Sequence, residues 1–141
     1  MRYSIVKLDT CLGSAYDINE HCDVVGFLSF AGHHTAFLWV PDEATKMRSL
    51  GTLGGSASTA YGINEYRQVT GSASVKWYKH AFRWTEAEGM QDIGPLGEHT
   101  GAGWAINNAG TIVGEASDLS HYMRAFTWTP ETGMQFFINV R

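Results

Sequence analysis

The chain of 141 residues has little charge, few prolines and few cysteines. Charged residues make up 17%, against roughly 25% in typical soluble domains. A disordered chain would be richer in charge, and the 13% of aromatic residues instead predicts a packed core. No apolar run approaches the ~20 residues of a membrane span, and the net charge of −4 gives no bulk support for nucleic-acid binding. We therefore expect neither a membrane nor a nucleic acid as partner.

Cys11 and Cys22 are the two cysteines. They flank a predicted strand and would stand too far apart for the ~5.5 Å Cα separation of a disulfide. Two unpaired thiols suit a reducing compartment. Near the N-terminus, Lys7 and Asp9 interrupt the apolar run that a secretory signal needs. Both observations favour a cytoplasmic location.

Glycine is frequent, with 16 residues, and its positions follow an internal repeat. Three segments share an Ala/Gly-aromatic-x-Ile-Asn block, a (Val/Ile)-x-Gly block and an Ala-Phe-x-Trp block in the same order. The first blocks end at Asn19, Asn64 and Asn107, the second at Gly26, Gly71 and Gly114, and the third at Trp39, Trp84 and Trp128. The Asn residues are 45 and 43 positions apart. Such self-similarity decides the fold before any local signal does.

In each block the side-chain types alternate with period two, and turn residues bound the block. This pattern predicts short strands. With a closing element at Met47, Met90 and Met134, each unit has four strands in about 44 residues, the size of a β-propeller blade. We expect one all-β domain spanning 1–141, with repeats at about 8–52, 53–95 and 96–141. A short helix over 42–50 remains an alternative, although the equivalent segments end in Gly-Met.

The turn after each Asn differs between repeats. In the third, Gly110 suits a left-handed conformation, but Cys22 and Arg67 stand at the equivalent positions. A residue with a side chain would cost on the order of 1 kcal/mol there. The sequence leaves open whether Cys22 and Arg67 adopt that conformation or whether their turns are rebuilt.

These blocks resemble the HAF repeat family, named for the block that stands here as His80-Ala81-Phe82. The family's Gly-Met-x-Asp-Leu-Gly-x-Leu-Gly element is similar to residues 89–97. Thr35 and Arg124 depart from the pattern, because the family has His there. The resemblance covers nearly the whole chain. It implies a propeller-like fold and brings no agreed activity and no catalytic residues. Proteins of that family are often longer and exported, which stands against the cytoplasmic location expected from the chain as given.

Closed propellers usually have four to eight blades, so three repeats leave two blade faces uncovered. We expect a propeller-like half ring that a homodimer closes into six blades, since symmetric dimers are the commonest assemblies. A splayed three-blade monomer and a heteromer are the alternatives. Residues 2–8 resemble a fourth strand preceding the first repeat, and 134–140 supplies that strand again. One of the two could pair across a subunit boundary.

The repeated aromatic residues and asparagines suggest sites, but a structural role is the stronger interpretation. Equivalent positions in every repeat normally pack repeat against repeat, so Phe37, Phe82 and Phe126 and the three tryptophans are predicted to form the core. The side chains of Asn19, Asn64 and Asn107 are predicted to cap the turn backbone.

A binding site is expected where the repeats differ, in the loops between the second and third strands. These loops contain four of the six histidines together with a Trp and two Tyr. Exposed aromatics beside His and Lys suit the recognition of a protein or a sugar, although variable solvated loops without a ligand are an equal alternative. The candidate surface consists of His33, His34, Trp77, Tyr78, Lys79, His99, His121 and Tyr122.

No nucleophile elbow, phosphate-binding loop or His-Glu-x-x-His motif is present. A metal would need three or more of the histidines to converge, and adjacent histidines rarely bind one ion. We therefore predict no enzyme activity, no metal and no cofactor. The expected function is that of a binding module for another protein. A carbohydrate-binding propeller lectin is the alternative, and a hydrolase is a weaker third.

Overall fold

The computed structural model describes residues 12–41 and 47–138 and contains three four-stranded antiparallel sheets there, with no helix in those ranges. The first sheet consists of β1 (Leu12–Ile18), β2 (Val24–Phe30), β3 (His33–Trp39) and β4 (Met47–Gly51). The second consists of β5 (Ser58–Ile63), β6 (Val69–Val75), β7 (Tyr78–Thr85) and β8 (Gly89–Gly94). The third consists of β9 (Gly101–Ile106), β10 (Ile112–Ser117), β11 (Met123–Thr129) and β12 (Gly133–Phe136).

In each sheet the strands pair in chain order, as the repeats predicted. The alternative of a helix over 42–50 is wrong for Met47–Gly51, which pairs with β3 as β4, while 42–46 lies outside the described residues. Residues 2–8, Cys11 and the last three positions of the chain also lie outside them. Cys22 is an exposed free thiol.

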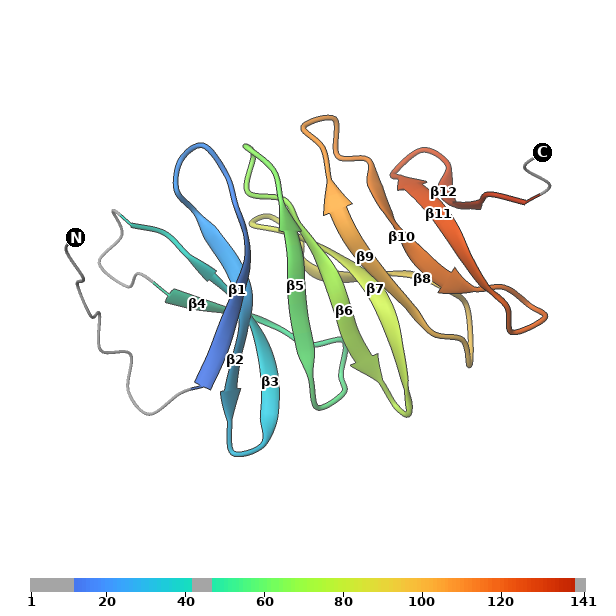
Figure 1. Cartoon of the computed structure of the whole chain (residues 1–141), viewed down its shortest axis with the longest axis horizontal. Coiled ribbons are helices and arrows are strands. Elements are labelled where there is room, and N and C mark those ends of the chain that lie inside the picture. Colours follow the sequence, from blue (N-terminus) through green and yellow to red (C-terminus); the bar gives the residue numbers. More distant parts are fainter. Residues whose placement is uncertain (1–11, 42–46, 139–141) are drawn as a thin grey trace.

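The three sheets lie side by side in sequence order along the long axis of the molecule (Figure 1). Each sheet has a forward face, which meets the next repeat, and a backward face, which meets the preceding one. Within the described residues the sheets form an open row and not a closed ring.

The core lies between the sheets. The forward face of the first sheet contributes Val25, Ala36 and Leu38, which pack against Val69, Phe82 and Trp84 of the second. At the next boundary Ala81 meets the backward face of the third sheet, formed by Ile112, Ala116 and Phe126. The three phenylalanines are at most 5% exposed, which confirms that they are core residues, although only Phe82 and Phe126 belong to the clusters between the sheets. Of the repeated tryptophans Trp84 is buried, whereas Trp39 and Trp128 are half-buried.

A β-bulge interrupts the first strand of every sheet and places an aromatic residue there. The pairing of β5 with β6 steps from Ala60 to Gly62, which leaves Tyr61 as the extra residue. Tyr16 and Trp104 are extra in the same way. The three rings follow one another across the repeats, with centroids 5.2 Å apart for Tyr16 and Tyr61 and 4.5 Å apart for Tyr61 and Trp104.

The bulge explains the repeated glycine of the second block. Gly26, Gly71 and Gly114 each lie opposite the bulge, where the neighbouring strand comes very close. A Cβ at Gly71 would overlap the carbonyl oxygen of Thr59 and crowd the ring of Phe82. Glycine is therefore required at these positions because it has no side chain. A left-handed backbone conformation is not the reason, since none of the three has a positive φ.

The turns after the first strands answer the question that the sequence left open. Cys22 and Arg67 adopt φ values of 63° and 55°, beside 82° for Gly110. Residues with side chains thus hold the left-handed conformation in two repeats. Each turn is capped by the preceding Asn, as predicted: the Oδ1 of Asn64, for example, accepts hydrogen bonds from the N–H groups of Tyr66 and Gln68.

Candidate functional site

The chain has two distinct ends along its strands. At one end, which we call the loop end, the turns at 31–32, 76–77 and 118–122 lie beside the connections between repeats, 52–57 and 95–100. The Asn-capped turns 19–23, 64–68 and 107–111 form the opposite, turn end. Figure 1 shows the two sets of turns along opposite edges of the row of sheets.

The loop end exposes large apolar side chains from all three repeats. The most exposed is Trp77 at 95%, at the tip of the β6–β7 hairpin. Other strongly exposed residues at this end are Phe30, Leu96, Leu119 and Tyr122. Scattered apolar residues are normal on a protein surface, but a row of them beside a cavity marks a candidate binding surface.

In the first two repeats the candidate residues flank the hairpin turns. His33 and His34 begin β3 and are exposed, and the imidazole of His34 stacks on Phe27 with centroids 4.1 Å apart. Tyr78 begins β7 and is half-buried, whereas Lys79 is exposed. His34 and Lys79 line the same small depression, of about 30 Å³, at the boundary of these repeats.

In the third repeat the turn 118–122 is held by Asp118. One carboxylate oxygen accepts the N–H groups of Ser120 and Tyr122, and the other accepts from Nε of Arg124 at 2.7 Å. The hydrogen bond from Arg124 is the main cause that lowers the pKa of Asp118. The same guanidinium lies over the ring of Tyr122. The turn therefore presents Leu119 and Tyr122 in a fixed geometry.

His99 and His121 come together from separate segments. His99 lies in the connection 95–100 and His121 in the turn of the β10–β11 hairpin, and their ring centroids are 4.8 Å apart. Tyr122 follows directly. Seven of the eight candidate residues thus fall into two groups, one around His34 and Lys79 and one around His99 and His121. Trp77 stands alone at its hairpin tip.

A pocket of about 670 Å³ opens between the second and third repeats. Its lining is mainly apolar and includes Pro95, Leu96, Leu119, Trp128, Met134 and Phe136. Leu96 and Leu119 belong to the loop end, so the pocket adjoins the exposed apolar residues there. Its volume falls within the range of ordinary ligand pockets.

His80 forms a polar wall of this pocket. Its side chain is 5% exposed, with Nδ1 2.8 Å from Oδ2 of Asp92 and Nε2 3.0 Å from the carbonyl oxygen of Gly97. Asp92 and Gly97 thus each contact one of the two ring nitrogens of His80. His80 therefore ties β7 to β8 and to the connection 95–100, and it gives the pocket a rigid side.

Sequence reasoning missed the pocket. Trp128, Met134 and Phe136 alternate with polar residues on their strands, which is the pattern of core residues, and the cavity arises only where the connection 95–100 passes over them. The pocket lining also includes His99, whose Nδ1 is buried and has no hydrogen-bond partner within the described residues. A lone histidine in a connection does not by itself disclose this in a sequence.

Among the described residues, no group of three His, Cys, Asp or Glu side chains could hold a metal ion. The same part of the chain contains no helix long and apolar enough to cross a membrane. What the loop end does offer is apolar surface, two imidazole groups in contact and a preformed cavity. This arrangement can bind a ligand.

Comparison with known proteins gives no relative: no family model, no curated protein and no solved structure matches the chain. The likeness to HAF repeats therefore stays a prediction. On its own geometry, the molecule is an all-β protein of three repeated four-stranded antiparallel sheets.

Proposed function

We propose that the protein is a non-catalytic binding module that recognises another protein through its loop end. The observation that carries the proposal is the pocket of about 670 Å³ beside a row of exposed apolar side chains. Protein interfaces concentrate their binding energy in a few aromatic or apolar residues that fill such pockets, surrounded by polar groups. Here the polar surroundings are His99, which lines the pocket, and His121, whose ring centroid lies 4.8 Å from that of His99.

The rigidity of the loop end supports the same function. The Asp118 hydrogen bonds fix one turn, and His80 fixes the connection beside the pocket. A preformed surface loses little conformational entropy on binding, which favours affinity. We expect an apolar side chain of the partner to enter the pocket between Leu96 and Leu119, with Trp77 contacting it from the second repeat.

The experiment compares partner binding by the wild-type chain, by two loop-end variants and by a control variant at the turn end. The wild type and Trp77→Ala would each be immobilised and exposed to extract of the source cell, and retained proteins identified and then measured as purified partners. Trp77→Ala should weaken binding by about tenfold or more, the effect of losing a large interface aromatic. Tyr66→Ala is the matched control, because Tyr66 is 71% exposed at the opposite, turn end.

The variant Leu119→Ser tests the third repeat in the same way and should also weaken binding. Equal binding by the wild type and both loop-end variants would contradict the proposal, as would a loss of binding with Tyr66→Ala alone. Circular dichroism would verify that each variant keeps the wild-type fold.

The alternative function is that of a carbohydrate-binding lectin. The almost complete exposure of Trp77 favours it, because a flat exposed indole is suited to stacking on a sugar ring. Binding to a glycan array that Trp77→Ala abolishes, without any retained protein, would support the lectin instead.

We also propose that the three sheets are blades of a propeller-like half ring, and that two copies of the chain close a ring of six blades. The support is the open forward face of the third sheet. Ala36 and Ala81 are fully buried by the following repeat, while Ala125 at the equivalent position is exposed. Likewise Val113 is 43% exposed, whereas Val25 and Thr70 are at 0%. Sedimentation equilibrium should give the mass of a dimer.

A further inference from the structure

Successive repeats are joined at the turn end by a ladder of hydrogen bonds that has a direction. Nδ2 of Asn19 donates to the carbonyl oxygen of Asn64 at 3.1 Å, and Nδ2 of Asn64 donates to that of Asn107 at 2.9 Å. Asn19 and Asn64 thus each use the side-chain oxygen to cap their own turn and the side-chain nitrogen to hold the next repeat.

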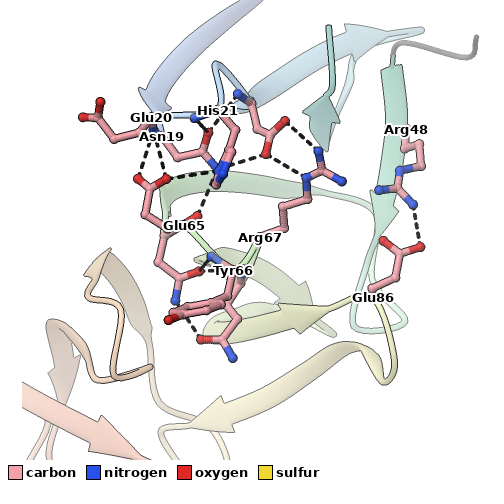
Figure 2. A network of polar contacts seen from close by, with 11 residues as sticks. Asn19, Glu20, His21, Arg48, Glu65, Tyr66, Arg67 and Glu86 are labelled. Atoms are coloured by element: carbon pink, nitrogen blue, oxygen red, sulfur yellow. Dashed lines mark hydrogen bonds and ion pairs between the residues drawn. The ribbon is translucent and has the colours of Figure 1, made fainter. Parts of the chain in front are cut away.

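A second set of hydrogen bonds follows the same direction one residue further on. The N–H of Glu20 donates to the carboxylate of Glu65, and the N–H of Glu65 donates to Oδ1 of Asn108. Figure 2 shows the first of these steps, where Asn19 and Glu20 lie against Glu65. Every repeat therefore presents two donors forward and two acceptors backward.

Within the part of the chain that the structure describes, the ladder ends on both sides with groups that have no partner. In the described residues, nothing accepts a hydrogen bond from Nδ2 of Asn107 or from the N–H of Asn108, and both residues are exposed. By contrast, Asn19 and Asn64 are 7% and 3% exposed. At the other side of the row, Cys22 is the one described residue that donates to the carbonyl oxygen of Asn19, and none bonds the carboxylate of Glu20.

The unused donors match the unused acceptors. A repeat that followed the third would have to supply a carbonyl oxygen opposite Asn107 and a side-chain acceptor opposite Asn108. The first repeat of this same chain carries both, at Asn19 and Glu20. No other sequence needs to be invoked to continue the pattern.

The apolar and aromatic parts of the two faces continue in the same register. Tyr16 and Trp104, at the two ends of the aromatic row, are 51% and 44% exposed. On the backward face of the first sheet Ile18 is 59% exposed, while its equivalent Ile63, covered by the preceding repeat, is 5% exposed. Both faces thus expose residues that the internal repeat boundaries bury.

We propose that the forward face of the third repeat binds the backward face of the first repeat of a second copy, and that the ladder sets the register of this contact. Asn107 Nδ2 donates to the carbonyl oxygen of Asn19 of the second copy, and the N–H of Asn108 donates to the carboxylate of its Glu20. The inference rests on the proposed dimer and assigns the residues that specify it. In a two-fold ring the contact occurs twice.

The variant Asn107→Asp tests the ladder without removing the cap of its turn. A carboxylate oxygen still accepts the N–H of Thr111, as Oδ1 of Asn107 does now, but the side chain can no longer donate. Each lost hydrogen bond should weaken association by about tenfold, and the two contacts together should raise the dissociation constant on the order of 100-fold. Gln91→Glu makes the same change in charge at an exposed position of β8 in the second sheet. This position belongs to neither of the two faces that form the proposed contact, so the dissociation constant should stay unchanged.

Glu20→Ala provides a second test from the opposite face. The Glu20 carboxylate has no partner among the described residues, so its removal leaves the fold of one chain intact while it deletes the acceptor for the partner's Asn108. The dissociation constants of all four chains would be measured by sedimentation equilibrium, with thermal unfolding by circular dichroism as the check on folding.

The outcomes separate the two proposals. A wild-type dimer that both variants weaken supports the ladder. A wild-type dimer that neither variant weakens keeps the dimer and overturns the ladder. A wild type that stays monomeric at high micromolar concentration overturns both, and it assigns the open face to a different occupant. Assembly without a fixed size overturns the closed ring, and the two variants then still decide whether the ladder makes the contact.

Discussion

The guanidinium of Arg67 reaches back across the repeat boundary to the carboxylate of Asp23, with Nε 2.7 Å from Oδ2 and the second nitrogen, NH2, 3.2 Å from Oδ1. Asp23 is fully buried and Arg67 is 39% exposed. Figure 2 draws this contact as dashed lines from the guanidinium of Arg67. The contact explains why the second repeat carries Arg where the third carries Gly: the ion pair offsets the cost of the left-handed conformation.

The same substitution in two equivalent turns should therefore have opposite effects. Cys22→Gly relieves the left-handed strain at an exposed thiol and should raise the free energy of unfolding by about 0.5–1 kcal/mol. Arg67→Gly relieves the same strain but removes the ion pair of the buried Asp23 carboxylate, which keeps the hydrogen bond from Nδ2 of Asn19. Arg67→Gly should therefore lower the free energy of unfolding by about 2 kcal/mol. This loss is smaller than the loss from breaking a fully buried ion pair, because Arg67 is partly exposed to water.

Urea unfolding at one fixed protein concentration would measure both changes, because self-association makes stability depend on concentration. A stabilising Arg67→Gly would show that the ion pair contributes nothing, and the explanation of the Arg would fail.

Acid should destabilise the protein through Asp23. Burial by itself would raise the pKa of this carboxyl, but the hydrogen bonds from Arg67 and Asn19 outweigh burial and hold the pKa below its ordinary value of 3.8. A group with a pKa lowered by folding stabilises the folded state above its unfolded pKa. That contribution is lost as the pH falls through the folded value.

We therefore expect the free energy of unfolding to fall below about pH 4. In Asp23→Asn the fall should be shallower, because the group that takes up the proton is missing. Urea unfolding at a series of pH values from 7 to 2.5 measures this. Asp118→Asn serves as the comparison, since Asp118 also has a lowered pKa but lies in the exposed loop end. Parallel pH profiles for the wild type and Asp23→Asn would refute the assignment.

The central step of the asparagine ladder should be the costliest to remove. Asn64→Asp keeps the acceptor for the N–H groups of Tyr66 and Gln68 but places a second carboxylate oxygen against the carbonyl of Asn107 and against Oε1 of Gln68. Because Asn64 is 3% exposed, water cannot compensate, and the loss should be about 2–3 kcal/mol. In dilute solution, where copies dissociate, Asn107→Asp should cost far less. Equal losses in the two variants, measured by urea unfolding, would contradict the ladder.

Much of the fold follows from the sequence because each strand and turn is predicted from three aligned copies of the same pattern. The period-two alternation predicts the strands, and the recurrence of Asn19, Asn64 and Asn107 before each turn predicts their capping role. Phe82 and Phe126 are buried for the reason expected, since equivalent positions pack repeat against repeat. These features depend on local pattern alone.

Other features depend on contacts between residues far apart in the chain. The φ of Arg67 could not be settled from its own turn, because the group that stabilises it, Asp23, lies 44 positions away. The pocket was also hidden, since it needs the connection 95–100 to pass over Trp128 and Met134. The order of the strands brings the candidate loop residues to one end of the molecule. The sequence of these loops does not predict that the residues divide into two groups there.

The bulge glycines give the sharpest test of the backbone geometry. A Cβ at Gly71 would overlap the carbonyl oxygen of Thr59, and β5 cannot retreat because it is packed between the first and third sheets. Gly71→Ala should therefore lower the free energy of unfolding by about 3 kcal/mol or more. Gly133→Ala is the control: a Cβ there meets open space, and only its φ of 67° opposes the change, at a cost of about 1 kcal/mol. If urea unfolding gave the two variants equal stability, the close approach of β5 and β6 at the bulge would be wrong, and with it the reason why this glycine recurs in all three repeats.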